Sequence, residues 1–145
     1  MTRSGIEISD DPARIDTDAV FGFLTTSYWA AGRPREVVER SIRHSLCFGA
    51  YDGSTQVGFG RVITDRAVFA YLADVFVIEA YRGRGIGRAL VAAMLADPRL
   101  AGVQQFLLRT RDAHGVYELL GFEPAPRPQE LMALAPHSGA RKGLG

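Results

Sequence analysis

The alternation of apolar and polar residues predicts an ordered series of strands and helices. Ile6 and Ile8 alternate with polar neighbours, which is typical of a short strand. Asp16 or Thr17 can cap the helix that follows, because short polar side chains accept hydrogen bonds from the first helical N–H groups. Pro34 suits the first turn of a second helix, where its missing N–H costs nothing. The N-terminal part of the chain therefore predicts a strand followed by two helices.

The middle of the chain has the pattern of three consecutive strands. Residues Leu46 to Tyr51 and Gln56 to Thr64 are strand-like and flank Asp52-Gly53, a dipeptide that favours a hairpin turn. The next segment, Ala67 to Ile78, is long, rich in aromatic residues and almost continuously apolar. This composition indicates a central strand that is covered on both faces.

The remainder of the chain predicts two helices and two strands. An apolar helical stripe, which Asp97-Pro98 ends, is formed by Ile86, Ala89, Leu90, Ala93 and Met94. Residues Gln105 to Thr110 form a strand, and Asp112 can cap a short helix that closes at Gly121. Leu131 to Leu134 are a candidate final strand. The expected order is β-α-α-β-β-β-α-β-α-β, an α/β fold.

Length and composition favour one domain. The chain has 145 residues, of which 47% are apolar, and a chain of this size can bury about two-thirds of its unfolded surface. We expect the domain to span residues 1–136. Residues 137–145 lack apolar periodicity, so we expect them to be flexible.

Charge and cysteine usage narrow the classes of function. The formal net charge is +1, which argues against a nucleic-acid surface. No apolar run approaches the roughly 20 residues needed to span a bilayer, so we expect no membrane partner. The single Cys47 forms no internal disulfide, and it has no metal-ligand spacing with His44, His114 or His137. These features indicate a cytoplasmic protein without a metal.

A segment rich in glycine and arginine joins the long central strand to the following helix. It reads Tyr81-Arg82-Gly83-Arg84-Gly85-Ile86-Gly87-Arg88. Glycines let the backbone approach a ligand, the free N–H groups of a helix start face anions, and arginines add positive charge. The segment therefore predicts a site for a diphosphate-bearing ligand.

The spacing of these glycines does not match two common nucleotide-binding signatures. A dinucleotide fingerprint requires Gly-x-Gly-x-x-Gly, but the last position is Arg88 when counted from Gly83 and Leu90 when counted from Gly85. No Gly-Lys-Ser or Gly-Lys-Thr follows a glycine run, as a P-loop requires. The pattern that fits is Arg-x-x-Gly-x-Gly over Arg82–Gly87, which resembles the acyl-CoA pyrophosphate loop of the GNAT superfamily of N-acetyltransferases.

Two flanking segments extend the resemblance. Leu72–Gly87 is similar to the family's fourth strand and its loop, and Val116–Phe122 is similar to the family's Tyr-x-x-x-Gly-Phe helix end. The resemblance implies a mixed, mostly antiparallel central sheet with helices on both faces, splayed at the cofactor site. It also implies an acetyl-CoA-dependent N-acetyltransferase that acts on a primary amine by direct attack in a ternary complex.

The resemblance also implies roles for individual residues. Main-chain groups of Val75, Phe76 and Val77 would bind the pantetheine arm and the thioester oxygen. Tyr117 stands where the family's tyrosine assists the departing sulfur, with an ordinary core tyrosine as the alternative. The implied diphosphate-binding residues are Arg82, Gly83, Arg84, Gly85, Ile86, Gly87 and Arg88.

Asp74 is an ionisable residue inside an apolar strand, so its carboxylate requires a partner. That partner is a cationic acceptor or Arg61 on the preceding strand, which simple hairpin register places on the same face unless a bulge intervenes. Asp74 is also a candidate to accept the amine proton, beside Glu79, His114 or a water chain. The glutamate that the family often carries on its fourth strand is Tyr71 here.

The acceptor itself is not specified by the sequence. Tyr28, Trp29, Tyr71 and Asp74 are candidates to bind it, although a lone tryptophan in a loop is as often a packing anchor. The acceptor is a small-molecule or peptide amine, and a homodimer is one open oligomeric state. The main alternative function is a non-catalytic acyl-CoA-binding or sensory module, and a nucleotide-binding protein is a second.

Overall fold

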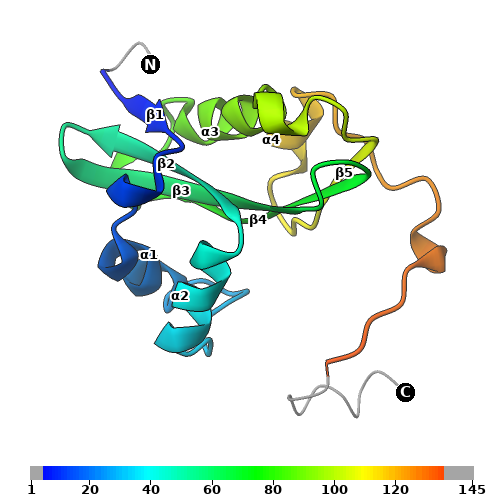
Figure 1. Cartoon of the computed structure of the whole chain (residues 1–145), viewed down its shortest axis with the longest axis horizontal. Helices are drawn as coiled ribbons and strands as arrows, with labels where there is room; N and C mark the ends of the chain where they lie inside the picture. Colours follow the sequence, from blue (N-terminus) through cyan, green and yellow to red (C-terminus); the bar gives the residue numbers. More distant parts are fainter. Residues whose placement is uncertain (1–4, 136–145) are drawn as a thin grey trace.

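The structure, a computed structural model, describes residues 5–135 and is built on a five-stranded sheet in the order β1-β2-β3-β4-β5 (Figure 1). The antiparallel pairs are β1–β2, β2–β3 and β3–β4, whereas β4 and β5 are parallel. This mixed, mostly antiparallel sheet agrees with the expected fold class. The strands are β1 (Glu7–Ser9), β2 (Leu46–Asp52), β3 (Thr55–Thr64), β4 (Phe69–Val77) and β5 (Gln105–Leu108).

Helices cover both faces of the sheet. Figure 1 shows α1 and α2 on one side and α3 and α4 on the other. The α-helices are α1 (Thr17–Leu24), α2 (Arg35–Arg43), α3 (Ile86–Leu95) and α4 (His114–Glu118). Short 3-10 turns are η1 (Pro12–Arg14), η2 (Glu79–Tyr81), η3 (Pro98–Leu100) and η4 (Pro128–Glu130).

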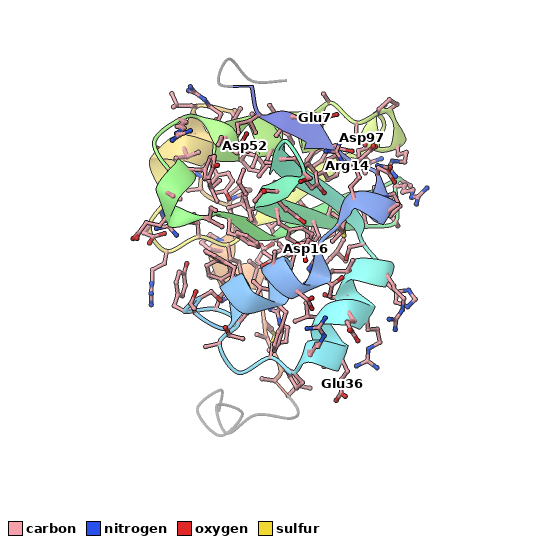
Figure 2. All side chains as sticks on the ribbon, turned by 90° about the vertical axis from the view of Figure 1, so that its left-hand side faces the viewer. Glu7, Arg14, Asp16, Glu36, Asp52 and Asp97 are labelled. Carbon is pink, nitrogen blue, oxygen red and sulfur yellow. The ribbon has the colours of Figure 1, made fainter. Side chains whose placement is uncertain are left out.

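Local signals in the sequence explain where several elements begin. The Asp16 carboxylate accepts a 3.1 Å hydrogen bond from the Ala19 N–H and so caps α1 next to the sheet (Figure 2). Pro34 is the residue immediately before α2. The turn between β2 and β3 contains Gly53, as the hairpin signal predicts. These expectations are confirmed.

The sheet separates two hydrophobic cores. The larger core packs the sheet against α3, whose buried residues are Ile86, Leu90, Val91 and Met94. The smaller core lies against α1 and α2 and contains Val20 and Val38. Because both sides are covered, β2 is buried along nearly its whole length. The strand expected to be covered on both faces, β4, instead alternates between buried and half-buried residues after its exposed first residue.

The last part of the chain differs from the sequence prediction. β5 ends at Leu108 rather than Thr110. Ala113 rather than Asp112 is the N-cap of α4, and the Thr110 hydroxyl accepts the Ala113 N–H at 3.0 Å. The expected final strand over Leu131 to Leu134 is wrong: these residues form no strand, and the three large apolar side chains are exposed. Apolar character without a sheet edge to pair with does not make a strand.

Two further expectations concern the chain's ends and the membrane. The tail at residues 137–145 lies outside the described residues. Within residues 5–135, none of the helices combines the length and the apolar character that crossing a membrane requires.

Candidate active site

The candidate site is the gap where β4 and β5 stop pairing. β4 pairs with β5 only from Phe69 to Leu72, because β5 ends at Leu108, the partner of Leu72. β4 continues to Val77, paired on its other side with β3. The main-chain groups that face β5 between residues 73 and 77 therefore have no neighbouring strand there. Apart from the Val77 carbonyl, which accepts a hydrogen bond from Arg82, they are available to a ligand lying in the gap.

A bulge in β4 turns Asp74 toward the face covered by α1 and α2. Arg61 lies opposite Ala73, so ordinary alternation would send the Asp74 side chain to the other face. The register shifts between Phe59 and Arg61, and Asp74 adopts φ 55°. The bulge therefore creates the contact with Arg61 rather than preventing it, and the simple-register argument was wrong on this point.

The Asp74 carboxylate is buried among three donors. Its Oδ2 accepts hydrogen bonds from Arg33 and Arg61, both at 2.8 Å, and its Oδ1 accepts the Trp29 indole N–H at 2.7 Å. Burial acts to raise the pKa of Asp74, but Arg61, Arg33 and Trp29 together hold it below its ordinary value. The internal partner expected for Asp74 is thus present, and the carboxylate stays ionised.

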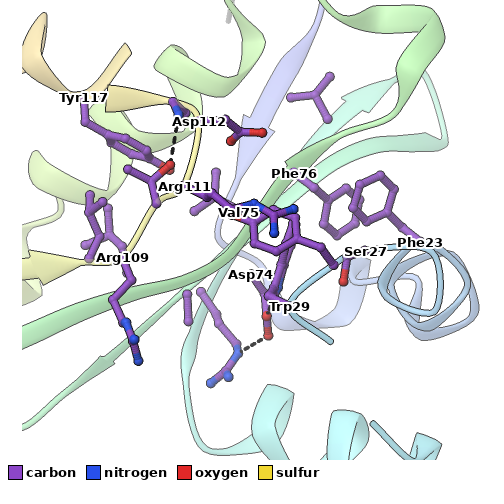
Figure 3. A pocket seen from close by; sticks show the side chains of 18 of the residues that line it. Phe23, Ser27, Trp29, Asp74, Val75, Phe76, Arg109, Arg111, Asp112 and Tyr117 are labelled. Atoms are coloured by element: carbon purple, nitrogen blue, oxygen red, sulfur yellow. Dashed lines mark hydrogen bonds and ion pairs between the residues drawn. The ribbon is translucent and has the colours of Figure 1, made fainter. Parts of the chain in front are cut away.

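A cleft of about 1150 Å³ occupies the gap and the adjoining face (Figure 3). It joins strand β4, the α1–α2 loop, the end of β5 and α4. Nine of the residues proposed from sequence line it, namely Tyr28, Trp29, Tyr71, Asp74, Val75, Phe76, Val77, Arg82 and Tyr117. The other proposed loop residues, Gly83 to Arg88, do not line the cleft and lie beside it at the start of α3.

The start of α3 has the geometry that a diphosphate requires. Gly83 and Gly85 have φ values of 80° and 78°, a conformation that favours glycine. Gly85 is the N-cap and offers no side chain, so the first N–H groups of α3 are left uncapped. Arg82 and Arg84 are exposed beside them, with the Arg82 Nε donating to the Val77 carbonyl at 3.0 Å. The loop thus offers free N–H groups and positive charge to an anion.

Tyr117 lies on the α4 wall of the cleft, half-buried (Figure 3). Its ring packs edge-on against Phe122, with centroids 5.8 Å apart. Burial, followed by the nearby Tyr28, raises the pKa of Tyr117. Within residues 5–135 its hydroxyl makes no protein hydrogen bond. At neutral pH the phenol is therefore a protonated donor available to a ligand.

Aromatic side chains form the wall on the α1 side. The Phe23 and Phe76 rings stack at a centroid distance of 3.9 Å, and Tyr28 meets Trp29 edge-on at 5.2 Å. Tyr28 and Trp29 are 51% and 40% exposed, so much of their surface faces the opening. These rings give the α1 side of the cleft an apolar surface.

Sequence reasoning missed several charged residues of the cleft and included others that are absent from it. Arg109, Arg111 and Asp112 line the cleft. The sequence feature that could have identified them is the run of charged residues directly after the apolar strand Phe106 to Leu108. Glu79 does not line the cleft, and His114 lines only a smaller neighbouring pocket.

Neither the Cys47 thiol nor a cluster of metal-binding side chains adds a reactive group to the described part of the chain. Cys47 is a buried free thiol in β2, and burial raises its pKa to about 11, which makes it a poor nucleophile. Among residues 5–135, no group of at least three His, Cys, Asp or Glu side chains is arranged to hold a metal ion.

Comparison with known proteins agrees with this geometry. The family model described as "Acetyltransferase (GNAT) domain" matches residues 43–124. A relative from Gibberella zeae, named "Putative acetyltransferase FG08082", is 34% identical over 84% of this chain and 81% of that protein. Serotonin N-acetyltransferase 2, chloroplastic, from Oryza sativa subsp. japonica is 31% identical over 78% of this chain, which spans only 61% of that protein.

A solved structure is similar over nearly the whole chain. This protein of Xanthomonas campestris pv. campestris, described as belonging to the GNAT family, is 44% identical and has a TM-score of 0.86, with 90% of this chain and 92% of that chain covered. The family match covers more than half of the 145 residues, including β4, the loop before α3 and Tyr117, but not the α1–α2 loop. The chain belongs to the GNAT family of acetyltransferases.

Proposed function

We propose that the protein transfers the acetyl group of acetyl-CoA to a primary amine by direct attack within a ternary complex. The observation that carries this proposal is the meeting of three features in one cleft. These are the uncovered main chain of β4, the phenol of Tyr117 and an aromatic wall open to solvent. Family membership supports the use of acetyl-CoA.

Acetyl-CoA would enter from the α3 side of the sheet. Its diphosphate would bind the first N–H groups of α3, where the helix dipole and Arg82 favour negative charge. The pantetheine arm would follow the uncovered main chain of residues 73–77. A main-chain N–H from Val75 to Val77 would face the thioester oxygen, and such a fixed donor is worth about 3 kcal/mol in comparable oxyanion sites.

The amine would approach from the face covered by α1 and α2, between Trp29 and Tyr71. Its lone pair attacks the thioester carbonyl carbon, forming a C–N bond and placing the electron pair on oxygen. When the tetrahedral intermediate collapses, the C–S bond breaks and the sulfur leaves as thiolate. The nitrogen loses one proton and the sulfur gains one, so the overall reaction needs no other reactant.

Deprotonation of the amine is the step that Asp74 is poorly suited to perform. Its pKa is held low and three donors occupy its oxygens, so it is a weak base. The arginines that outnumber aspartates along the cleft disfavour an ammonium ion. We propose that this positive field lowers the pKa of the bound amine, and that the proton leaves to water. Asp74 is then a positioning residue.

Tyr117 would stabilise the departing thiolate. Its hydroxyl has no protein partner among the described residues and its pKa is raised, so it remains protonated while the sulfur develops charge. Because a thiol is more acidic than this phenol, hydrogen-bond donation is favoured over full proton transfer.

A free-thiol release assay with acetyl-CoA and a panel of amines tests the proposal. An acetyltransferase releases thiol in proportion to the amine consumed. The competing function, an acyl-CoA-binding or sensory module, would bind acetyl-CoA in a thermal-shift assay but release no thiol with any amine. That result would overturn the proposed function.

A further inference from the structure

We propose that the acceptor amine carries an anionic group, a carboxylate or a phosphate, which Arg109 and Arg111 bind. This inference rests on the proposed function and names the class of acceptor that the cleft selects. It is argued from charge, from the face on which the two arginines lie, and from their lack of carboxylate partners among the described residues.

The cleft concentrates positive charge. Its lining contains five arginines and two aspartates, an excess of three positive charges, while the whole chain has a formal net charge of only +1. Such a lining attracts an anion and repels a purely cationic ligand. The charged lining residues are Arg33, Arg61, Arg82, Arg109, Arg111, Asp74 and Asp112.

Two of these arginines are unpaired. Asp74 is shared by Arg33 and Arg61, and Arg82 is the first residue of the proposed diphosphate loop, Arg82–Arg88. In the described part of the chain, no carboxylate lies within ion-pair distance of Arg109 or Arg111. The remaining aspartate of the cleft, Asp112, lies on the Tyr117 side in Figure 3, away from the Arg109 guanidinium.

These two arginines lie on the acceptor side of the sheet. Phe106 and Leu108 pack against the core beneath α3. Side chains alternate between the two faces of an extended chain, so Arg109, the next residue, faces the side of the sheet that α1 and α2 cover. Figure 3 shows Arg109 extending toward α2, whereas the diphosphate loop begins α3 on the opposite face (Figure 1). Arg109 is therefore separate from the charges that would hold acetyl-CoA.

Arg111 is held in place by an aromatic ring. Its guanidinium carbon lies 3.6 Å from the centroid of the Tyr28 ring, a cation–π contact at the mouth of the cleft. Stacking on a ring leaves the N–H groups at the guanidinium edge free. These can bind a carboxylate or phosphate through two parallel hydrogen bonds. An aromatic surface beside a free guanidinium suits an acceptor with both an apolar body and an anionic group.

Matched pairs of acceptors test the inference. Phenylalanine would be compared with phenylalaninamide, and phosphoethanolamine with ethanolamine, in the thiol-release assay at saturating acetyl-CoA. We expect at least one anionic member to have a kcat/KM about 10- to 100-fold above that of its partner without the anionic group, as charge-assisted hydrogen bonds imply. The pair that shows the preference identifies the carboxylate or the phosphate as the group bound.

Variants assign the preference to the two arginines. Arg109→Ala and Arg111→Ala should each lower kcat/KM for the preferred anionic acceptor about tenfold or more. They should lower kcat/KM for the partner that lacks the anionic group by much less, and the acetyl-CoA affinity should stay unchanged. Arg109→Lys should restore part of the preference. Arg40→Ala, which removes an exposed arginine of α2 outside the cleft, is the matched control and should change none of these values.

Two results would overturn the inference. If amines without an anionic group, serotonin or phenethylamine included, are acetylated as well as those that carry one, and the arginine variants do not change the ratio, the anionic acceptor is wrong while the proposed function stands. If no amine of either kind releases thiol although acetyl-CoA binds, the proposed function fails and this inference fails with it.

Discussion

The indole N–H of Trp29 donates a 2.7 Å hydrogen bond to Oδ1 of Asp74, which ties the loop after α1 to the bulge in β4. Arg33, from the same loop, binds the other carboxylate oxygen at 2.8 Å. The loop that forms the proposed acceptor wall is thus fixed to the strand that would hold the thioester. In the proposed mechanism, the alignment of the two substrates would depend on one buried carboxylate.

Replacing Trp29 by phenylalanine keeps an aromatic ring but removes the N–H donor. Hydrogen bonds to charged groups contribute about 1.5–3 kcal/mol, so the loop should lose its fixed position. We expect KM for the acceptor to rise about tenfold, with acetyl-CoA affinity unchanged in calorimetry. An equal loss of acetyl-CoA affinity would show that Trp29 does not serve the acceptor side alone.

Replacing Asp74 by asparagine leaves two guanidiniums near an uncharged group. Because removing one partner of a buried ion pair typically costs about 3–5 kcal/mol, we expect a loss of that order in the free energy of unfolding, measured by urea denaturation at pH 7. Asparagine tolerates the positive φ of this position, so the change reports on charge rather than strain.

The same variant predicts a pH dependence. The folded pKa of Asp74 lies below its unfolded value, so its stabilisation is complete above the ordinary carboxyl pKa of about 3.9 and is lost as pH falls through the lower folded pKa. The window from pH 5 to 7 begins about one unit above the ordinary carboxyl pKa. The difference in the free energy of unfolding between wild type and Asp74→Asn should therefore be constant across this window and should shrink only in more acidic solution. A difference that already shrinks in this window would contradict the lowered pKa.

Replacing Tyr117 by phenylalanine should lower kcat at least about tenfold while acetyl-CoA binding is retained, because the thiolate loses its donor. In the wild type, the raised pKa of Tyr117 predicts that the donor role persists up to pH values above about 10. Thiol-release rates measured at a series of alkaline pH values show where this donor role is lost. Unchanged turnover in the variant would remove Tyr117 from the mechanism.

Replacing Gly85 by alanine should weaken acetyl-CoA binding. A Cβ there meets no protein atom within 4 Å, but φ 78° disfavours alanine by about 1 kcal/mol and the methyl group would sit where the diphosphate approaches. We expect an increase of about tenfold in Kd by calorimetry, a change worth about 1.4 kcal/mol. Gly102→Ala, at an equally open position without a positive φ, should leave Kd unchanged.

The elements around the diphosphate loop were accessible from sequence because each has a local physical cause. The apolar run of β4, the glycines after it and the apolar stripe of α3 occur within one contiguous segment, and the structure begins α3 at Ile86. Tyr117 and the residues of β4 were brought to one cleft as expected.

Features that depend on contacts between distant parts of the chain could not be predicted from the sequence. The positive φ of Asp74 is a property of the β3–β4 register rather than of its neighbours in sequence. Arg33 reaches Asp74 across 41 positions, so no spacing rule predicts the contact. The apolar residues from Leu131 to Leu134 satisfied a strand pattern, but strands require a pairing edge that the local sequence does not specify.

A crystal structure of the protein with acetyl-CoA tests the central claim most directly. The account predicts the diphosphate on the first N–H groups of α3, the pantetheine arm along residues 73–77 of β4, and the thioester sulfur within hydrogen-bond distance of the Tyr117 hydroxyl. Acetyl-CoA bound elsewhere, with the gap between β4 and β5 empty of it, would contradict the account.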